Sequence, residues 1–191
     1  PDYQRVANDD ARARFEKLWN TRLDPKPGLT VVEIMDAVHA GTIRGMYIMG
    51  ENPAMSDPDA HHARAALAKL EHLVVQEIFL TETCYHADVI LPATVWPEKS
   101  GTVTNTDRMV QMGRAAITPP GEVKPDLWII QEIARRIGLD WNYAGPKDVF
   151  NEMRQAMNSI AGITWERLEA ESSVTYPCEK EGDPGQDRKS T

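Results

Sequence analysis

The middle of the chain alternates short apolar runs with polar turns. Residues 45–49, 73–75 and 89–91 are apolar, and each run ends in polar or turn-forming residues. A helical pattern fills residues 58–70, between the first run and the second. Strand, turn, helix, strand, turn and strand in this order are typical of a nucleotide-binding α/β unit with a parallel sheet.

Helices are predicted on both sides of this unit from capping residues and apolar spacing. Thr30 with Glu33 forms a capping box for a helix over residues 31–40. The polar segment 98–108 is predicted to be a long loop, followed by an edge strand over 109–112. The same signals predict further helices over residues 9–19, 126–137 with Asp126 as its cap, 147–157 and 164–171.

The domain organisation expected from this pattern is simple. Residues 1–178 carry the alternating elements and are expected to form one domain. Residues 179–191 are polar with Gly and Pro, which predicts a flexible tail. The chain begins at Pro1 rather than Met, and we expect it to be a part of a longer subunit.

Composition narrows the class of protein. Of 191 residues, 41% are hydrophobic and 26% charged, so a packed domain is expected rather than disorder. The net charge of −8 argues against nucleic acid as a partner, because such proteins present clustered Lys and Arg. A nucleotide cofactor stays compatible, since backbone N–H groups can hold it. No apolar run is long enough to span a membrane, and we expect an intracellular, cytoplasmic location.

Cysteine and histidine give weak signals for metal or nucleophile chemistry. Cys84 and Cys178 are too few for an iron–sulfur cluster, although a disulfide between them is left open by counting. Cys84 and His86 would splay apart on a helix, which disfavours a nucleophilic dyad. His61 and His62 are adjacent helical positions that point in different directions, so a solvated face is favoured over a metal site.

Polar residues follow the end of each predicted strand. They are the loop 50–52 after the first strand, 76–77 after the second and 93–94 after the third. In a parallel sheet these ends share one edge, and ligands of such folds bind beyond it. The chain lacks the glycine fingerprints of NAD-binding domains and of P-loops.

Each of these polar groups also has a plain structural interpretation. The loop 50–52 is as compatible with a turn as with a ligand site. Asp88 and Asp126 are positioned to cap a strand and a helix, respectively. Glu98, Asn105 and Arg108 could line a cleft, but by pattern alone they are better explained as a solvated loop.

Several motifs in a fixed order resemble the molybdopterin oxidoreductases, and the nearest members are catalytic subunits of molybdenum- or tungsten-dependent formate dehydrogenases. The resemblance extends over nearly the whole chain. It is carried by YIMGENP at residues 47–53, VQEIFLTET at 75–83, ADVILP at 87–92, the segment 98–108, GITWE at 162–166 and YPC at 176–178. One departure is Ala93, where some relatives have Ser, which removes one hydroxyl.

The resemblance implies an α/β fold, namely a Rossmann-like three-layer domain with a mostly parallel sheet and flanking helices. It also implies that this domain binds one of two molybdopterin guanine dinucleotides. The residues implied to contact the cofactor are Gly50, Glu51, Asn52, Ser56, Gln76, Glu77, Asp88, Asn105 and Asp126.

The resemblance also implies what this chain does not carry. The family's metal-ligating Cys or selenocysteine and its iron–sulfur cysteines precede this region, so no catalytic or metal-ligating residue is expected here. Formate oxidation to CO2 would need the complete enzyme, whose other domains and electron-transfer subunits would be the partners. A non-catalytic scaffold of the same fold, as in respiratory complex I, is the alternative, and a free-standing NAD-binding module is disfavoured by the missing fingerprint.

Overall fold

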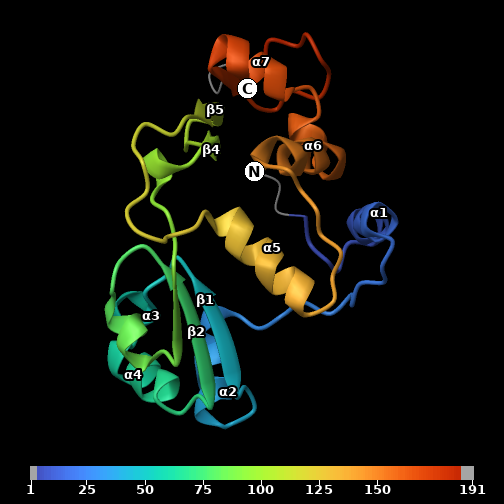
Figure 1. Ribbon diagram of the computed structural model, residues 1–191. Coiled ribbons are helices and arrows are strands. Elements are labelled where there is room, and N and C mark those ends of the chain that lie inside the picture. Colours follow the sequence, from blue (N-terminus) through green and yellow to red (C-terminus); the bar gives the residue numbers. More distant parts are fainter. Residues whose placement is uncertain (1–3, 186–191) are drawn as a thin grey trace. The chain divides into compact units, whose positions relative to one another are not determined.

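The computed structural model of the chain describes residues 4–185. By its internal contacts the chain divides into two compact units (Figure 1). Unit 1 comprises the described residues within 1–27, 96–118 and 131–191, and unit 2 comprises residues 28–95 and 119–130. A single domain over residues 1–178 was expected, and this expectation stays a prediction.

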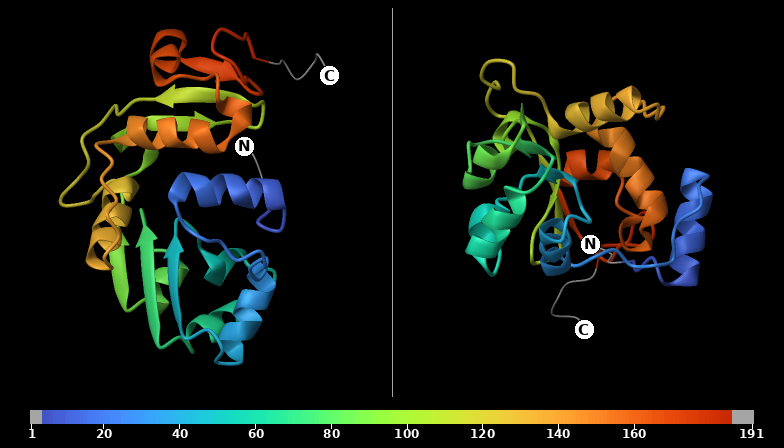
Figure 2. Two further views of the ribbon diagram at one scale, coloured as in Figure 1. Left: turned by 90° about the vertical axis from the view of Figure 1, so that its right-hand side faces the viewer. Right: turned by 90° about the horizontal axis from the view of Figure 1, so that it is seen from below.

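Unit 2 is built on a three-stranded parallel sheet in the order β1-β2-β3. The strands are β1 (Gly45–Met49), β2 (His72–Glu77) and β3 (Val89–Pro92), and they coincide with the three apolar runs. Ile48 is paired with Val75, and Val75 with Ile90, so β2 is the central strand. Figure 2 shows the strands side by side with their arrows in one direction. The predicted α/β class, with a parallel sheet flanked by helices, is confirmed.

The helices of unit 2 differ from the prediction in one place. Instead of one helix over residues 58–70, the structure has α3 (Pro53–Ser56) and α4 (Ala60–Leu67) beside α2 (Val31–His39) and the 3₁₀ helix η1 (Glu82–His86). Asp59 caps α4, because its carboxylate accepts a hydrogen bond from the backbone N–H of His62 at 3.0 Å. The capping box of Thr30 and Glu33 at the start of α2 is present as predicted.

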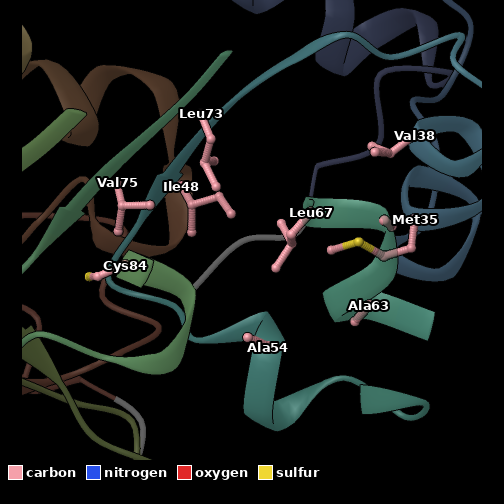
Figure 3. Packing of buried hydrophobic residues seen from close by; sticks show 10 residues of the cluster. Met35, Val38, Ile48, Ala54, Ala63, Leu67, Leu73, Val75 and Cys84 are labelled. Carbon is pink, nitrogen blue, oxygen red and sulfur yellow. The ribbon is translucent and has the colours of Figure 1, made fainter. Parts of the chain in front are cut away.

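An apolar cluster on one face of the parallel sheet holds unit 2 together (Figure 3). Side chains of the strands, such as Leu73 and Val75, meet Leu67 of α4, and all three are at most 1% exposed. Burying a Leu or Val side chain of this kind contributes roughly 1.5–3 kcal/mol. The cluster comprises Met35, Val38, Ile48, Ala54, Ala63, Ala66, Leu67, Leu73, Val75 and Cys84.

Unit 1 contains a second sheet, which corrects the sequence-based prediction. The segment expected to be a loop forms β4 (Gly101–Thr104), which pairs antiparallel with β5 (Met109–Gly113). β5 is the central strand and not an edge, because β6 (Ser173–Thr175) pairs with its other side. β6 comes from far along the chain, and periodicity within a short window cannot reveal such a partner.

The other elements of unit 1 largely match the prediction. They are α1 (Asp9–Trp19), η2 (Trp96–Glu98), α6 (Pro146–Ala156), η3 (Asn158–Ile160) and α7 (Trp165–Glu171). Helix α5 (Asp126–Arg136) begins in unit 2 and ends in unit 1. Within residues 4–185, none of the helices combines the length and apolar character needed to cross a membrane.

The expected tail is partly packed against unit 1. Glu181 forms an ion pair with Arg154 at 2.9 Å, and the carbonyl of Asp183 accepts a hydrogen bond from Arg167 at 2.7 Å. Residues 179–185 are therefore attached to α6 and α7. The rest of the expected tail, 186–191, lies outside the described residues.

Candidate functional site at the carboxyl edge of the parallel sheet

The carboxyl ends of the strands in unit 2 are joined by backbone hydrogen bonds. The N–H of Gly50 donates to the carbonyl of Gln76 at 2.9 Å, and the N–H of Ala93 donates to Glu77 at 3.0 Å. A short parallel bridge between Ala93 and Lys124 then brings the segment before α5 to the same edge. The expectation that the polar groups after the strands share one edge is thus confirmed. We call this region, with the start of α5, the carboxyl edge.

Gly50 gives the loop after β1 its shape. Its φ of +63° is in the left-handed region, where a side chain would be strained. A Cβ built on Gly50 would meet no atom within 4 Å, so the space beside its backbone is open. The adjoining Glu51 is exposed. Burial of Asp57, and secondly the charge of Glu51, raise the pKa of Asp57. The loop thus carries negative charge next to open space.

Asn52 fastens this loop to η1. Its Oδ1 accepts hydrogen bonds from the hydroxyl of Thr83 at 2.8 Å and from the backbone N–H of Thr83 at 3.2 Å. Its Nδ2 donates to Glu82 at 2.7 Å, and this bond holds the pKa of Glu82 below its usual range. The buried Thr83 hydroxyl in turn accepts from the N–H of Ala54 at 3.1 Å. Asn52 therefore fixes the loop, and a cofactor contact by its side chain stays a prediction.

Two further predicted residues lie on the same edge with their side chains bonded locally. Ser56 is exposed on α3, and its hydroxyl donates to the carbonyl of Asn52 at 3.0 Å. Glu77 is partly exposed, and its carboxylate accepts from the N–H of Ile78 at 2.7 Å. A carboxylate has further acceptor positions, so the Glu77 bond leaves capacity for a ligand hydroxyl.

Gln76 is the buried centre of the edge. Its side chain is 0% exposed, although it is polar. Its Nε2 donates to the carboxylate of Asp126 at 2.7 Å, and its Oε1 accepts a hydrogen bond from the hydroxyl of Tyr47. Burial, and secondly the charge of Asp126, raise the pKa of Tyr47. The three residues therefore connect β1, β2 and the start of α5.

The structure does not bring Asp88 to the carboxyl edge. It precedes β3 at the amino edge of the sheet, and its carboxylate accepts a hydrogen bond from the N–H of Leu73 at 2.7 Å. His72 is a second neighbour, with its Nδ1 at 3.7 Å. Asp88 thus joins the starts of β2 and β3, the capping role that was its structural alternative.

Asn105 belongs to unit 1, in the turn between β4 and β5. Its Oδ1 accepts a hydrogen bond from the N–H of Met109 at 3.0 Å. This bond closes the hairpin, so the side chain has a local role. A cofactor contact by Asn105 stays a prediction.

Sequence reasoning missed three residues that build the carboxyl edge. Tyr47 belongs to an apolar run and to a family motif, and neither predicts that its hydroxyl bonds Gln76. Thr83 belongs to the motif at 75–83, which predicts no role for its hydroxyl. Lys124, whose ammonium lies 5.5 Å from the ring centre of Trp128, carries no motif. Lys124 precedes α5, so helical spacing does not predict its contact with Trp128.

The two cysteine thiols of the chain are buried and make local contacts. Cys84 and Cys178 are free thiols and both are buried, so the disulfide left open by the sequence is not formed. The Sγ of Cys84 lies 3.4 Å from the hydroxyl of Thr81 and 3.6 Å from the carbonyl of Phe79. Among residues 4–185, no group of three or more His, Cys, Asp or Glu side chains is arranged to hold a metal ion.

Comparison with known proteins gives consistent relatives. Residues 3–136 match the family described as molybdopterin oxidoreductase. The chain is 46% identical over 187 residues to the F420-dependent formate dehydrogenase subunit alpha of Methanocaldococcus jannaschii, covering 97% of this chain and 27% of the relative. It is 44% identical over 176 residues to the putative formate dehydrogenase YrhE of Bacillus subtilis, covering 92% of this chain and 18% of the relative.

A solved structure shows the same fold. The acetylene hydratase of Pelobacter acetylenicus superposes with a TM-score of 0.66 over 90% of this chain and 24% of that protein, at 18% identity. This chain therefore spans about a quarter or less of the proteins it resembles. Because the family match covers most of the sequence and homologues named formate dehydrogenase align over nearly all of it, the chain belongs to the molybdopterin oxidoreductase family.

Proposed function

We propose that the carboxyl edge of unit 2 binds one molybdopterin guanine dinucleotide in the catalytic subunit of a formate dehydrogenase. The observation that carries this proposal is the convergence of the loop after β1, the end of β2 and the start of α5. Such an edge is where nucleotide-binding α/β folds accommodate their ligands. Formate oxidation to CO2 would be the activity of the complete enzyme.

The chemistry of the edge suits the guanosine end of this cofactor. Guanine presents two neighbouring N–H donors, and a carboxylate such as the partly exposed Asp126 can accept from both. Glu51 and Glu77 can accept from ribose hydroxyls, and the open space beside Gly50 lets the backbone approach a ligand closely. A concentration of carboxylates disfavours the pyrophosphate, which we therefore assign to other parts of the complete subunit.

The cofactor itself would supply the redox chemistry of its molybdenum or tungsten ion when bound. This chain's residues would hold and orient its nucleotide. Iron–sulfur clusters, electron-transfer subunits and the remaining domains of the catalytic subunit complete the proposal, together with a cytoplasmic location. In this view the chain contributes no group that reacts with formate.

One observation favours the scaffold alternative. The amide groups of Asn52 and Gln76 are both engaged within unit 2, as they would be in a domain that only maintains its own fold. Metal analysis of the complete protein separates the two functions. Active protein without molybdenum and tungsten would favour the scaffold, and about one metal ion per subunit would favour the cofactor site.

The direct test measures guanine nucleotide in the complete subunit. We expect Asp126→Asn to lower the GMP released per protein by about tenfold, because the amide replaces one acceptor by a donor facing guanine N–H groups. Asp59→Asn is the matched control, since it removes a carboxylate from unit 2 while Asn still caps α4. Equal GMP contents in the Asp126→Asn variant and the wild type would overturn the assignment of Asp126.

A further inference from the structure

Gln76 combines full burial with two polar partners on different elements. It follows Val75 on the central strand, and because side chains alternate along a strand it lies on the face opposite the apolar cluster. Neither end of its amide faces solvent, since the side chain is 0% exposed. A buried amide without hydrogen bonds would be costly, so both of its bonds are required by the fold.

The orientation of this amide is fixed by the chemistry of its partners. An ionised carboxylate only accepts hydrogen bonds, so the NH₂ group of Gln76 must face Asp126. The carbonyl oxygen must then face Tyr47, whose hydroxyl donates to it. The reverse orientation would set the amide oxygen against the carboxylate, which is repulsive. The hydrogen bonds from Tyr47 to Gln76 and from Gln76 to Asp126 therefore run in one direction, and the second restrains the Asp126 carboxylate.

We propose that Gln76 is a positioning residue, which sets the direction of the Asp126 carboxylate and does not itself contact the dinucleotide. This inference rests on the proposed function, in which Asp126 meets the guanine base. The observation that supports it is the difference in solvent exposure among the three hydrogen-bonded residues. Gln76 is fully buried, whereas Asp126 is partly exposed and Tyr47 is 43% exposed. The resemblance implies a direct cofactor contact by Gln76, which is untested; the full burial of its side chain favours an indirect role.

The role has a consequence for base selectivity. A carboxylate held in one direction can match the paired N–H donors of guanine, whereas cytosine offers an acceptor ring nitrogen beside its amino group. A carboxylate that has lost the Gln76 hydrogen bond is less restricted in direction, and this advantage is reduced. Removal of Gln76 should therefore reduce the preference for guanine over cytosine dinucleotide, and not only the stability of unit 2.

The test uses the complete subunit, freed of cofactor and reconstituted with molybdopterin guanine dinucleotide or molybdopterin cytosine dinucleotide. We expect Gln76→Met, which keeps the volume but removes both hydrogen bonds, to lower the guanine-over-cytosine preference about tenfold, the loss typical when the partner that orients a binding side chain is removed. A purely structural role would lower Tm and leave the preference intact, and that result would overturn the proposal.

A reversed pair distinguishes positioning from folding. Gln76→Glu sets two carboxylates together and should lower both Tm and guanine preference, whereas Gln76→Glu combined with Asp126→Asn restores a hydrogen bond of opposite polarity. We expect the double variant to recover Tm relative to Gln76→Glu but not the guanine preference. Recovery of the preference as well would mean that a carboxylate at position 126 is not required, and the proposal would fail.

The outcomes also distinguish this inference from the function on which it rests. If Asp126→Asn alone leaves guanine preference unchanged, the proposed contact between Asp126 and guanine is wrong. If Asp126→Asn lowers the preference and Gln76→Met does not, only the positioning role is wrong. If the Gln76→Met variant does not fold, Tyr47→Phe removes the hydrogen bond between Tyr47 and Gln76 instead. We expect about a twofold loss of guanine preference in this variant. An unchanged preference in Tyr47→Phe would then count against the positioning role.

Discussion

At the carboxyl edge of the parallel sheet Asp126 accepts a hydrogen bond from the side chain of Gln76, whereas at the amino edge Asp88 accepts one from the backbone of Leu73. Both are single carboxylates at the start of an element, Asp88 before β3 and Asp126 at the beginning of α5, and the sequence treated them alike. Asp88 satisfies a backbone donor and joins two strands. Asp126 is held by a buried side chain that is itself fixed by Tyr47. The two carboxylates therefore differ in their partners, a side chain for Asp126 and a backbone N–H for Asp88, and the proposed function assigns a ligand only to Asp126.

The largest difference between the two edges is expected when Gln76, the centre of the carboxyl edge, is replaced. Gln76→Leu should destabilise unit 2 by about 2 kcal/mol or more, because it leaves Tyr47 and Asp126 without their shared partner. Thermal unfolding of the complete subunit measures the effect. Gln111→Leu is the matched control, because Gln111 is exposed on β5. The Tm of this variant should stay close to that of the wild type.

The loop after β1 is expected to show the next largest effect. Asn52→Ala removes the acceptor of the buried Thr83 hydroxyl and should cost about 1–2 kcal/mol. It should also let the pKa of Glu82 rise, because the Asn52 hydrogen bond is the main cause that lowers it.

A pH series checks the Asn52 prediction. A lowered carboxyl pKa gives stability that is present above the unfolded pKa of Glu82 and is lost as the pH falls through its folded pKa. The Tm difference between wild type and Asn52→Ala should therefore shrink in acid. A difference that grows in acid would contradict the role of the Asn52–Glu82 bond.

The amino edge should respond with stability alone. Asp88→Ala removes the acceptor of the Leu73 N–H and should cost about 1 kcal/mol, with no change in guanine nucleotide content. Asp88→Asn keeps an acceptor oxygen and should retain most of that stability. A loss of nucleotide in Asp88→Ala at unchanged Tm would show that the two edges are not functionally distinct.

The smallest expected effect concerns charge at the carboxyl edge. Glu51→Gln should lower the pKa of Asp57, because the Glu51 charge is the second cause, after burial, that raises it. A raised carboxyl pKa favours the folded state at low pH, and that contribution is lost as the pH rises through the folded pKa. An NMR titration of Asp57 measures the shift directly. An unchanged pKa would mean that burial acts alone.

Much of the fold could be predicted because it depends on local pattern. The three parallel strands and the capping box of Thr30 were found from apolar runs and capping residues within short windows. The hairpin of β4 and β5 was missed since its polar sequence read as a loop, and its stabilising partner β6 lies far away in sequence. The split between α3 and α4 was missed because Asp59 competes with nearby capping residues that the pattern cannot rank.

For the candidate site, the sequence located the carboxyl edge but not the roles of its residues. It grouped the residues after β1 and β2 with Asp126, and the structure joins them. It did not distinguish Asp126 from Asp88, because both are acidic residues at the start of an element. Nor did it separate the accessible Glu51 from the engaged Asn52, because hydrogen-bond partners such as Thr83 are distant in sequence.

The family of this chain, its three parallel strands and the edge where polar groups gather can be read from short-range pattern and motif order. The burial of Gln76, its bonds to Tyr47 and Asp126, and the bond of Asp88 at the opposite edge become visible only in the folded chain. The physical reason is that a polar group's burial and partners depend on which segments fold around it, and those segments are set by packing and not by spacing along the chain.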